Sequence, residues 1–226
     1  MEKIKWIGFD MDDCIANVTP AYHFVKALGV EKLAPLLLES DKVGQTWLLR
    51  SNIQLIVDEV SNAVKDGKVY GAFLYSNNAS ISMVELVKTM LNLMSNDVNP
   101  FKFGFHRGFV ARTGTKVKTY EDLCNCLHVA DLPLPSTPDC LAFFDDKVQI
   151  LRSEIKLYRR VRRYRGYTPV QRIAEVLEDQ LGEEELSDNV VLAAFQDEFQ
   201  REEKIKNRDD QNPFVFIDTI QKLCIV

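Results

Sequence analysis

Short apolar runs alternate with stretches of helical period along most of this chain, and this alternation restricts the possible folds more than any other feature. Apolar runs rich in aromatic and β-branched residues predict strands at 4–9, 70–75, 101–105 with 109–111, 140–144 and 156–164. Between them, apolar residues recur every three to four positions. This pattern is typical of an α/β fold with a mainly parallel sheet flanked by helices.

Helix-start signals agree with the alternation. The predicted N-caps are Ser82 (with Glu85), Thr119 (with Asp122) and Thr168 (with Pro169 and Gln171). Each one stands just ahead of an apolar face at helical spacing.

The chain is predicted to form one main domain over residues 1–181. Within it, residues 17–66 hold more helical pattern than a single crossover helix needs, so we expect a small helical insertion after the first strand. Residues 182–226 are charge-rich and then apolar. We expect them to form a helical C-terminal appendix packed on the same domain.

Composition excludes several classes of protein. With 226 residues and 46% hydrophobic content the chain can bury a core, and its net charge of −5 gives no overall nucleic-acid signature. Neither a secretory leader nor an apolar run of membrane-spanning length is evident. The five cysteines lack zinc spacing or a paired framework. We therefore expect a cytoplasmic or nuclear protein with no membrane segment, and not a secreted one.

Polar residues gather where the apolar runs end. The clusters are Asp10, Asp12 and Asp13; Ser76, Asn77 and Asn78; Lys116 and Lys118, ahead of the helix start at Thr119; and Asp145, Asp146 and Lys147. In open α/β sheets, ligands bind outside the carboxyl ends of the strands. We expect these clusters to meet at one edge of the sheet.

The residue types in these clusters suit phosphoryl chemistry. Carboxylates that stay ionised side by side need a cation, and oxygen-only ligands favour Mg²⁺ over Zn²⁺. A carboxylate can also attack phosphorus, while a second one two positions on protonates the leaving oxygen and then activates water. Ser76 and either Lys116 or Lys118 can bind phosphoryl oxygens. One Asp-x-Asp alone is a common turn, so the order of all four clusters carries the inference.

These residues resemble the haloacid dehalogenase superfamily of aspartate-nucleophile phosphotransferases. Asp10-Met11-Asp12 is similar to its first motif, Ser76 to its second, the lysine to its third and Asp145-Asp146 to its fourth. Over residues 4–180 the chain looks most like the small magnesium-dependent phosphatases, and more distantly like the RNA polymerase C-terminal-domain phosphatase branch. The resemblance implies a Rossmann-like sheet.

The resemblance also implies roles for individual residues. Asp10 would be the nucleophile and a metal ligand, and Asp12 the general acid/base that also lends its backbone carbonyl to the metal. Ser76 would hold the phosphoryl group. Lys116 is the preferred third-motif lysine, with Lys118 as the fallback. The implied metal ligands are Asp10, Asp12, Asp145 and Asp146, and the candidate substrate-binding residues are Asn77, Lys118 and Lys147. Asp13 is expected to be a solvated turn residue with no role.

Residues 156–167, the basic strand, are rich in arginine and allow two interpretations. They can be a terminal strand whose charges are solvated or paired with the acidic appendix. Alternatively, the arginines and the interleaved Tyr158, Tyr164 and Tyr167 can bind a nucleic acid or a phosphoprotein.

The sequence therefore predicts a Mg²⁺-dependent phosphatase that hydrolyses a phosphomonoester through an aspartyl-phosphate. Its substrate would be a phosphorylated small molecule or a phosphoprotein. One alternative is a protein with weak or no turnover that binds nucleic acid or a phosphoprotein through the basic strand. Another is a receiver-type signalling domain, which also gathers Asp, Ser or Thr, and Lys around Mg²⁺.

Overall fold

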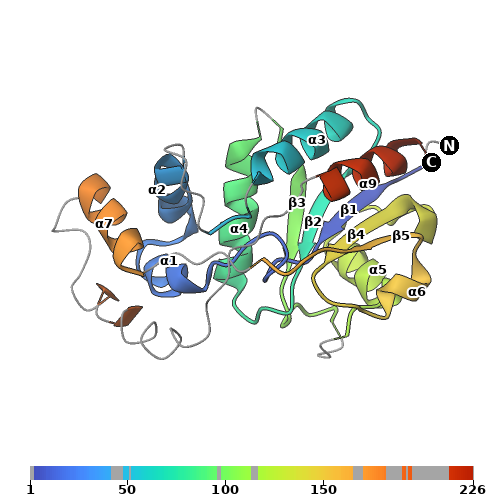
Figure 1. Ribbon diagram of the computed structural model, residues 1–226. Coiled ribbons are helices and arrows are strands. Elements are labelled where there is room, and N and C mark those ends of the chain that lie inside the picture. The colour runs from blue at the N-terminus through green and yellow to red at the C-terminus, as the bar shows by residue number, and fades with distance from the viewer. Residues whose placement is uncertain are drawn as a thin grey trace.

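The fold is built on a five-stranded parallel sheet. The computed structural model describes residues 3–41, 48–50, 52–95, 98–112, 117–164, 170–181, 190–191, 193–194 and 214–225. The strands are β1 (Trp6–Phe9), β2 (Gly71–Tyr75), β3 (Phe101–Phe105), β4 (Leu141–Asp145) and β5 (Leu157–Arg160). All neighbours pair in parallel, in the order β3-β2-β1-β4-β5 (Figure 1). The predicted α/β class is confirmed.

The central strand β1 is buried on both faces, which is why its sequence is an unbroken apolar run. Ile7 and Phe9 belong to the core on one face of the sheet, and Trp6 belongs to the core on the other. Gly8 lies where aromatic rings of both neighbouring strands approach. A Cβ atom there would come within 2.5 Å of a Phe143 ring carbon and 2.7 Å of the Phe73 ring, so no larger residue fits without movement.

Helices cover both faces of the sheet (Figure 1). One face carries α3 (Ile53–Lys65), α4 (Ile81–Met94) and α9 (Phe214–Ile225), and the other carries α5 (Tyr120–Val129) and α6 (Leu151–Glu154). From α9, the Phe216 ring stacks 4.8 Å from the Phe144 ring. No helix in the described part of the chain has the length and apolar character needed to cross a bilayer.

The helical insertion lies beside the sheet rather than on it. It consists of η1 (Thr19–Ala21), α1 (Tyr22–Leu28) and α2 (Val30–Asp41), while α3 contacts β2 and α9 and so is the crossover helix to the second strand. Helix α7 (Val170–Leu181) follows β5 but packs against α2 and η1 (Figure 1). Helix α7, although it follows the last strand, therefore packs on the helical insertion and not on the sheet.

Some predicted boundaries are wrong. Helix α4 is capped by Ser80, whose hydroxyl accepts from the Met83 N–H at 3.4 Å, and Ser82 lies inside the helix. Residues 109–111 form no strand, because the chain turns after β3 with Phe109 N–H bonded to the His106 carbonyl. Strand β5 ends at Arg160 and not at 164.

The N-cap of α5 is Thr119, as predicted, with its hydroxyl 3.1 Å from the Asp122 nitrogen. The predicted cap at Thr168 and Pro169 lies outside the described residues, as does most of the expected appendix, including 182–189 and 195–213.

Candidate functional site

Three carboxylates meet where strand order reverses, at the carboxyl ends of β1 and β4. Asp10 directly follows β1, Asp145 ends β4 and Asp146 comes next. The Asp10 N–H donates to the Phe144 carbonyl at 2.8 Å and so carries the strand pairing one residue past β1. All three residues are buried, and one oxygen of each lies within 4.8 Å of the others. Such a reversal point is where ligands bind in open parallel sheets.

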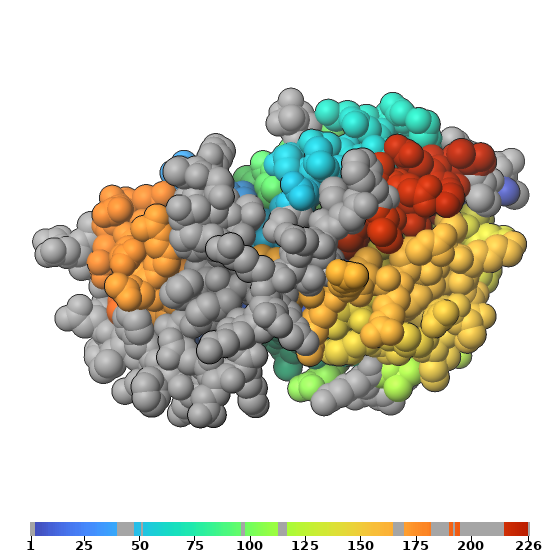
Figure 2. Space-filling model, viewed as in Figure 1, coloured from blue at the N-terminus to red at the C-terminus, as the bar shows by residue number. Residues whose placement is uncertain are grey.

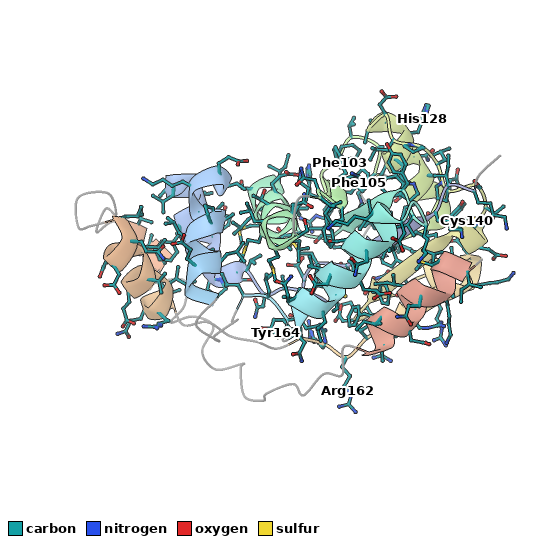
Figure 3. All side chains as sticks on the ribbon, turned by 90° about the horizontal axis from the view of Figure 1, so that it is seen from above. Phe103, Phe105, His128, Cys140, Arg162 and Tyr164 are labelled. Carbon is teal, nitrogen blue, oxygen red and sulfur yellow. The ribbon has the colours of Figure 1, made fainter. Side chains whose placement is uncertain are left out.

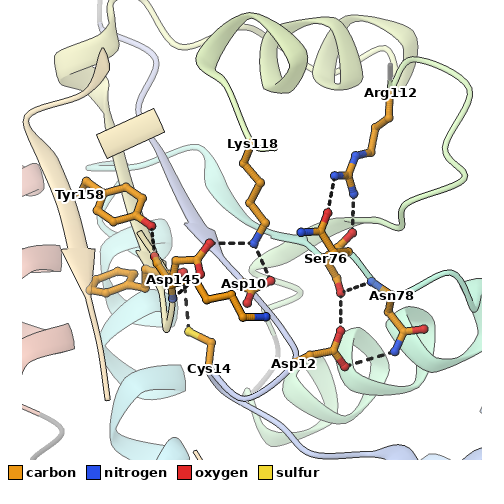
Figure 4. Close-up of polar contacts among 12 residues, drawn as sticks. Asp10, Asp12, Cys14, Ser76, Asn78, Arg112, Lys118, Asp145 and Tyr158 are labelled. Atoms are coloured by element: carbon orange, nitrogen blue, oxygen red, sulfur yellow. Dashed lines mark hydrogen bonds and ion pairs between the residues drawn. The ribbon is translucent and has the colours of Figure 1, made fainter. Parts of the chain in front are cut away.

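Lys118 joins two of these acids (Figure 4). Its Nζ lies 2.5 Å from Asp10 Oδ1 and 2.8 Å from Asp145 Oδ2, and only 1% of the side chain is exposed. Its backbone carbonyl accepts from the Leu151 N–H at 3.0 Å, which fixes the segment ahead of α5 against α6. We call Asp10, Asp145, Asp146 and Lys118 the acid cluster.

Burial dominates the electrostatics of the acid cluster. It raises the pKa of Asp10 from 3.8 to about 7, although the Lys118 charge acts in the opposite direction. Burial alone would lower the pKa of Lys118, but Asp10 and Asp145 outweigh it and the pKa is raised. Burial also raises the pKa of Asp146. The folded protein therefore holds these carboxylates at an electrostatic cost.

The acid cluster fits a divalent cation. With its acids ionised the cluster has three negative charges and the one buried positive charge of Lys118, and the half-exposed Arg163 lies 3.6 Å from Asp146 Oδ2. Asp146 Oδ1 is buried and has no hydrogen-bond partner among the described residues. A buried carboxylate oxygen without a donor is costly unless a cation meets it. Carboxylate-only ligands suit a hard ion such as Mg²⁺.

A second polar cluster lies at the end of β2. The Ser76 hydroxyl donates to Asp12 Oδ2 at 2.8 Å, and the Asn78 amide donates to Asp12 Oδ1 at 3.1 Å (Figure 4). The Asn78 N–H donates to Ser76 Oγ at 2.9 Å. Asp12 lies only two residues after Asp10, yet its carboxylate is hydrogen-bonded by residues that follow β2.

Arg112 completes this second cluster and was not predicted. Its guanidinium is buried, donates to the Ser76 carbonyl and to Asn77 Oδ1 at 2.8 Å, and lies 4.4 Å from the centre of the Tyr75 ring. We call Ser76, Asn78, Asp12 and Arg112 the serine cluster. Arg112 directly follows the segment 109–111 that the sequence predicted as a strand, and no local pattern pointed to it.

Asp13 is a turn residue, as expected, but it is ion-paired. Its φ of 60° is left-handed, a conformation that Asp tolerates better than most residues. Arg163 Nε donates to Asp13 Oδ2 at 2.6 Å and also lies 3.6 Å from Asp146 Oδ2. Arg163 therefore links the loop after β1 to the acid cluster.

Arg50 is a second buried arginine that sequence reasoning missed. It donates from Nε to the Cys14 carbonyl and from a terminal nitrogen to the Arg162 carbonyl, the latter at 2.7 Å. Its guanidinium also lies near the Tyr164 and Phe216 rings. Cys14 itself is buried, and burial raises the pKa of its thiol.

The structure brings most of the predicted site residues to one edge of the sheet. Asp10, Asp145, Asp146 and Lys118 form one cluster, and Ser76 and Asp12 form the adjoining one. The carboxylate of Asp12 is not among the three clustered acids.

The remaining predicted residues lie at the margin of the site. Asn77 contacts Arg112, and Lys147 is exposed, with its N–H bonded to Asp145 Oδ1 at 2.8 Å. Lys116, the preferred third-motif lysine, lies outside the described residues. The lysine that the structure places among the acids is Lys118.

Comparison with known proteins gives no family assignment. No protein-family model matches the chain, and no curated protein is significantly similar to it in sequence. The motifs and the geometry of the two clusters are therefore the features that bear on function.

Proposed function

We propose that this protein is a Mg²⁺-dependent phosphatase of the haloacid dehalogenase type, which hydrolyses a phosphomonoester through phospho-Asp10. The observation that carries the proposal is the buried negative charge of the acid cluster beside an independently held second carboxylate, Asp12. Two acids two residues apart, in different surroundings, can take two different roles.

Asp10 is the nucleophile in this proposal. One of its carboxylate oxygens attacks phosphorus, the bond from phosphorus to the ester oxygen breaks, and the leaving oxygen takes a proton from Asp12. In the second step, water attacks the phosphorus of the aspartyl-phosphate and gives its proton to Asp12. Inorganic phosphate leaves and the Asp10 carboxylate is restored.

The neighbouring residues hold these two acids in position. Lys118 orients Asp10 through a 2.5 Å contact and supplies positive charge for the phosphoryl oxygens. Ser76 and Asn78 fix both oxygens of Asp12, and the Ser76 hydroxyl can turn to a phosphoryl oxygen. We assign the third-motif role to Lys118 because it makes these contacts.

A magnesium ion would be held by Asp10, Asp145 and Asp146, with the backbone carbonyl of Asp12. When bound, it supplies positive charge that offsets the negative charge of the acid cluster and of the phosphoryl group. The unpartnered oxygen of Asp146 supports this ligand set.

The strand order argues against a receiver-type domain. Receiver-type sheets have the order 2-1-3-4-5, so β1 lies between β2 and β3. Here β1 lies between β2 and β4. The second acidic pair therefore comes from β4, which suits the phosphatase proposal.

The proposal is tested by release of phosphate from an aryl phosphate with and without Mg²⁺. We expect Asp10→Asn to lower turnover by about 1,000-fold or more, since no other group can form the covalent intermediate. Asp13→Asn is the matched control, because it removes an acid from the same loop but outside the acid cluster. Equal turnover by Asp10→Asn, or a stable stoichiometric phosphoryl adduct without turnover, would rule the proposal out.

A further inference from the structure

A basic hollow adjoins the acid cluster. It has a volume of about 590 Å³, and its lining includes Asp146, Lys147, Arg160, Arg162 and Arg163. This volume lies within the usual range for small-molecule sites. Asp146 belongs both to the acid cluster and to the lining of the hollow. A ligand in the hollow therefore lies next to the proposed reaction centre.

The charged groups of the hollow face solvent. Lys147, Arg160, Arg162 and Arg163 are all exposed, and Figure 3 shows Arg162 projecting away from the chain. In Figure 2, β5 and the segment after it lie at the surface beside α9. Among the described residues, no acid forms an ion pair with Lys147, Arg160 or Arg162. The hollow thus presents Lys147, Arg160 and Arg162 to solvent, while Arg163 is ion-paired with Asp13 and lies near Asp146.

Two of the three tyrosines in the nucleic-acid interpretation are buried, and the third, Tyr167, lies outside the described residues. Tyr158 is 7% exposed and Tyr164 is 4% exposed, and their hydroxyls bond to the Lys147 and Leu49 carbonyls. Neither ring can stack on a base. Recognition of single-stranded nucleic acid normally needs such stacking. The chemistry that remains is cationic and suits a compact anion.

We propose that the basic hollow binds a second phosphate of the substrate, so that the preferred substrate is a small molecule carrying two phosphate groups. This inference rests on the proposed function, because it places the cleaved phosphate at Asp10. Arginine forks bind phosphate oxygens in pairs, and Arg160 and Arg162 both line the hollow beside Asp146. A singly phosphorylated ester leaves these cations unused.

The experiment compares kcat/KM for matched pairs, such as fructose 6-phosphate and fructose 1,6-bisphosphate, with an aryl phosphate as the reference. We expect the bisphosphate to be favoured about 10-fold or more, and this preference to fall several-fold in Arg160→Gln and in Arg162→Gln. Arg152→Gln, an exposed arginine of α6 outside the hollow, is the control and should retain the preference. All three variants should keep the aryl phosphatase activity.

Three results would overturn the inference. The first is a bisphosphate-to-monophosphate ratio of kcat/KM near one in the natural protein, and the second is a ratio that neither Arg160→Gln nor Arg162→Gln changes. The third is a higher kcat/KM for a phosphopeptide, or for 5′-phosphorylated oligonucleotides of increasing length, than for the bisphosphate. The last result would assign the hollow to a macromolecule.

A binding measurement separates this inference from the proposed function. Calorimetry of the bisphosphate with Asp10→Asn, in buffer without metal, should show binding that weakens about 10-fold when Arg162→Gln is added and that also weakens with salt. If no phosphate ester is hydrolysed but this binding is found, the proposed function fails and the hollow remains an anion site. If hydrolysis is found without this binding, the inference alone fails.

Discussion

The acid cluster and the serine cluster share one edge of the sheet but differ in charge balance. In the serine cluster, the one carboxylate, Asp12, accepts hydrogen bonds on both oxygens, and the one guanidinium, Arg112, donates to the Ser76 carbonyl and to Asn77. In the acid cluster, Lys118 pairs with Asp10 and Asp145, and Asp146 lies 3.6 Å from the half-exposed Arg163. The Asp12 carboxylate is satisfied by neighbouring side chains, whereas Asp146 Oδ1 in the acid cluster has no hydrogen-bond partner among the described residues and suits a bound cation.

The largest expected effect comes from removing the one cation of the acid cluster. Lys118→Met leaves Asp10 and Asp145 buried without their partner, so we expect the free energy of unfolding to fall by about 3–5 kcal/mol. Urea denaturation measures this loss. Mg²⁺ should stabilise this variant more than it stabilises the natural protein, because the variant has more uncompensated negative charge in the acid cluster. An exposed control, Lys147→Met, should change little, and an equal loss in both variants would contradict the comparison.

Metal binding should depend on the acid cluster and not on the side chains of the serine cluster. Mg²⁺ at one hundred times its dissociation constant should stabilise the natural protein by about 2.7 kcal/mol. Asp146→Asn should remove most of this gain, because Asp146 Oδ1, which has no hydrogen-bond partner among the described residues, is an expected metal ligand. Asp12→Asn should keep it, because its carboxylate is bound by Ser76 and Asn78. Thermal denaturation with and without Mg²⁺ measures the stabilisation of each variant. A larger stabilisation of Asp146→Asn than of Asp12→Asn would refute the prediction.

The raised pKa of Asp10 in the acid cluster should make the stability of the protein depend on pH. In the unfolded chain Asp10 loses its proton near its ordinary pKa of 3.8, but in the folded protein its pKa is about 7. Between these values the folded state binds more protons, so its stability falls as pH rises from about 4 to 7. The slope from Asp10 is at most about 1.4 kcal/mol per pH unit. Denaturation in a chelating buffer should show this slope, and Asp10→Asn should reduce it. An unchanged slope in the variant would assign the titration to another group.

The smallest effect is expected at Asp13, which lies near both clusters but belongs to neither. Asn tolerates the left-handed φ of 60°, and the ion pair that it loses is with a half-exposed arginine. Asp13→Asn should therefore cost less than about 1 kcal/mol and leave turnover of an aryl phosphate nearly unchanged. A tenfold loss of turnover with stability retained would show that Asp13 belongs to the reaction machinery.

The sheet and the acids could be predicted from the sequence because both depend on local pattern. A strand buried on both faces is an unbroken apolar run, and the residues after such runs lie at one edge of a parallel sheet. That reasoning placed Asp10, Ser76 and Asp145 correctly relative to the strands. Boundaries were less certain, since a serine two positions away offers the same capping chemistry, as Ser80 and Ser82 show.

Local pattern names Lys118 only as the fallback to Lys116 and gives no sign of Arg50 or Arg112, because the contacts of these long side chains are tertiary. Val117 is 40% exposed whereas Lys118 is 1% exposed, the reverse of what hydrophobicity predicts, and only the tertiary pairing with two carboxylates explains it. The same reasoning applies to Arg50 and Arg112. Their guanidiniums bond to backbone carbonyls far along the chain, and no spacing rule identifies such partners.

Arg50 also bears on motion. One guanidinium bonds at the same time to the carbonyl of Cys14, in the loop that carries the proposed nucleophile, and to the carbonyl of Arg162, in the wall of the basic hollow. These two hydrogen bonds tie the loop to the wall, so a displacement of either segment alone would stretch or break one of them. If the hollow binds an anion, the same contacts would help to hold the loop that carries Asp10.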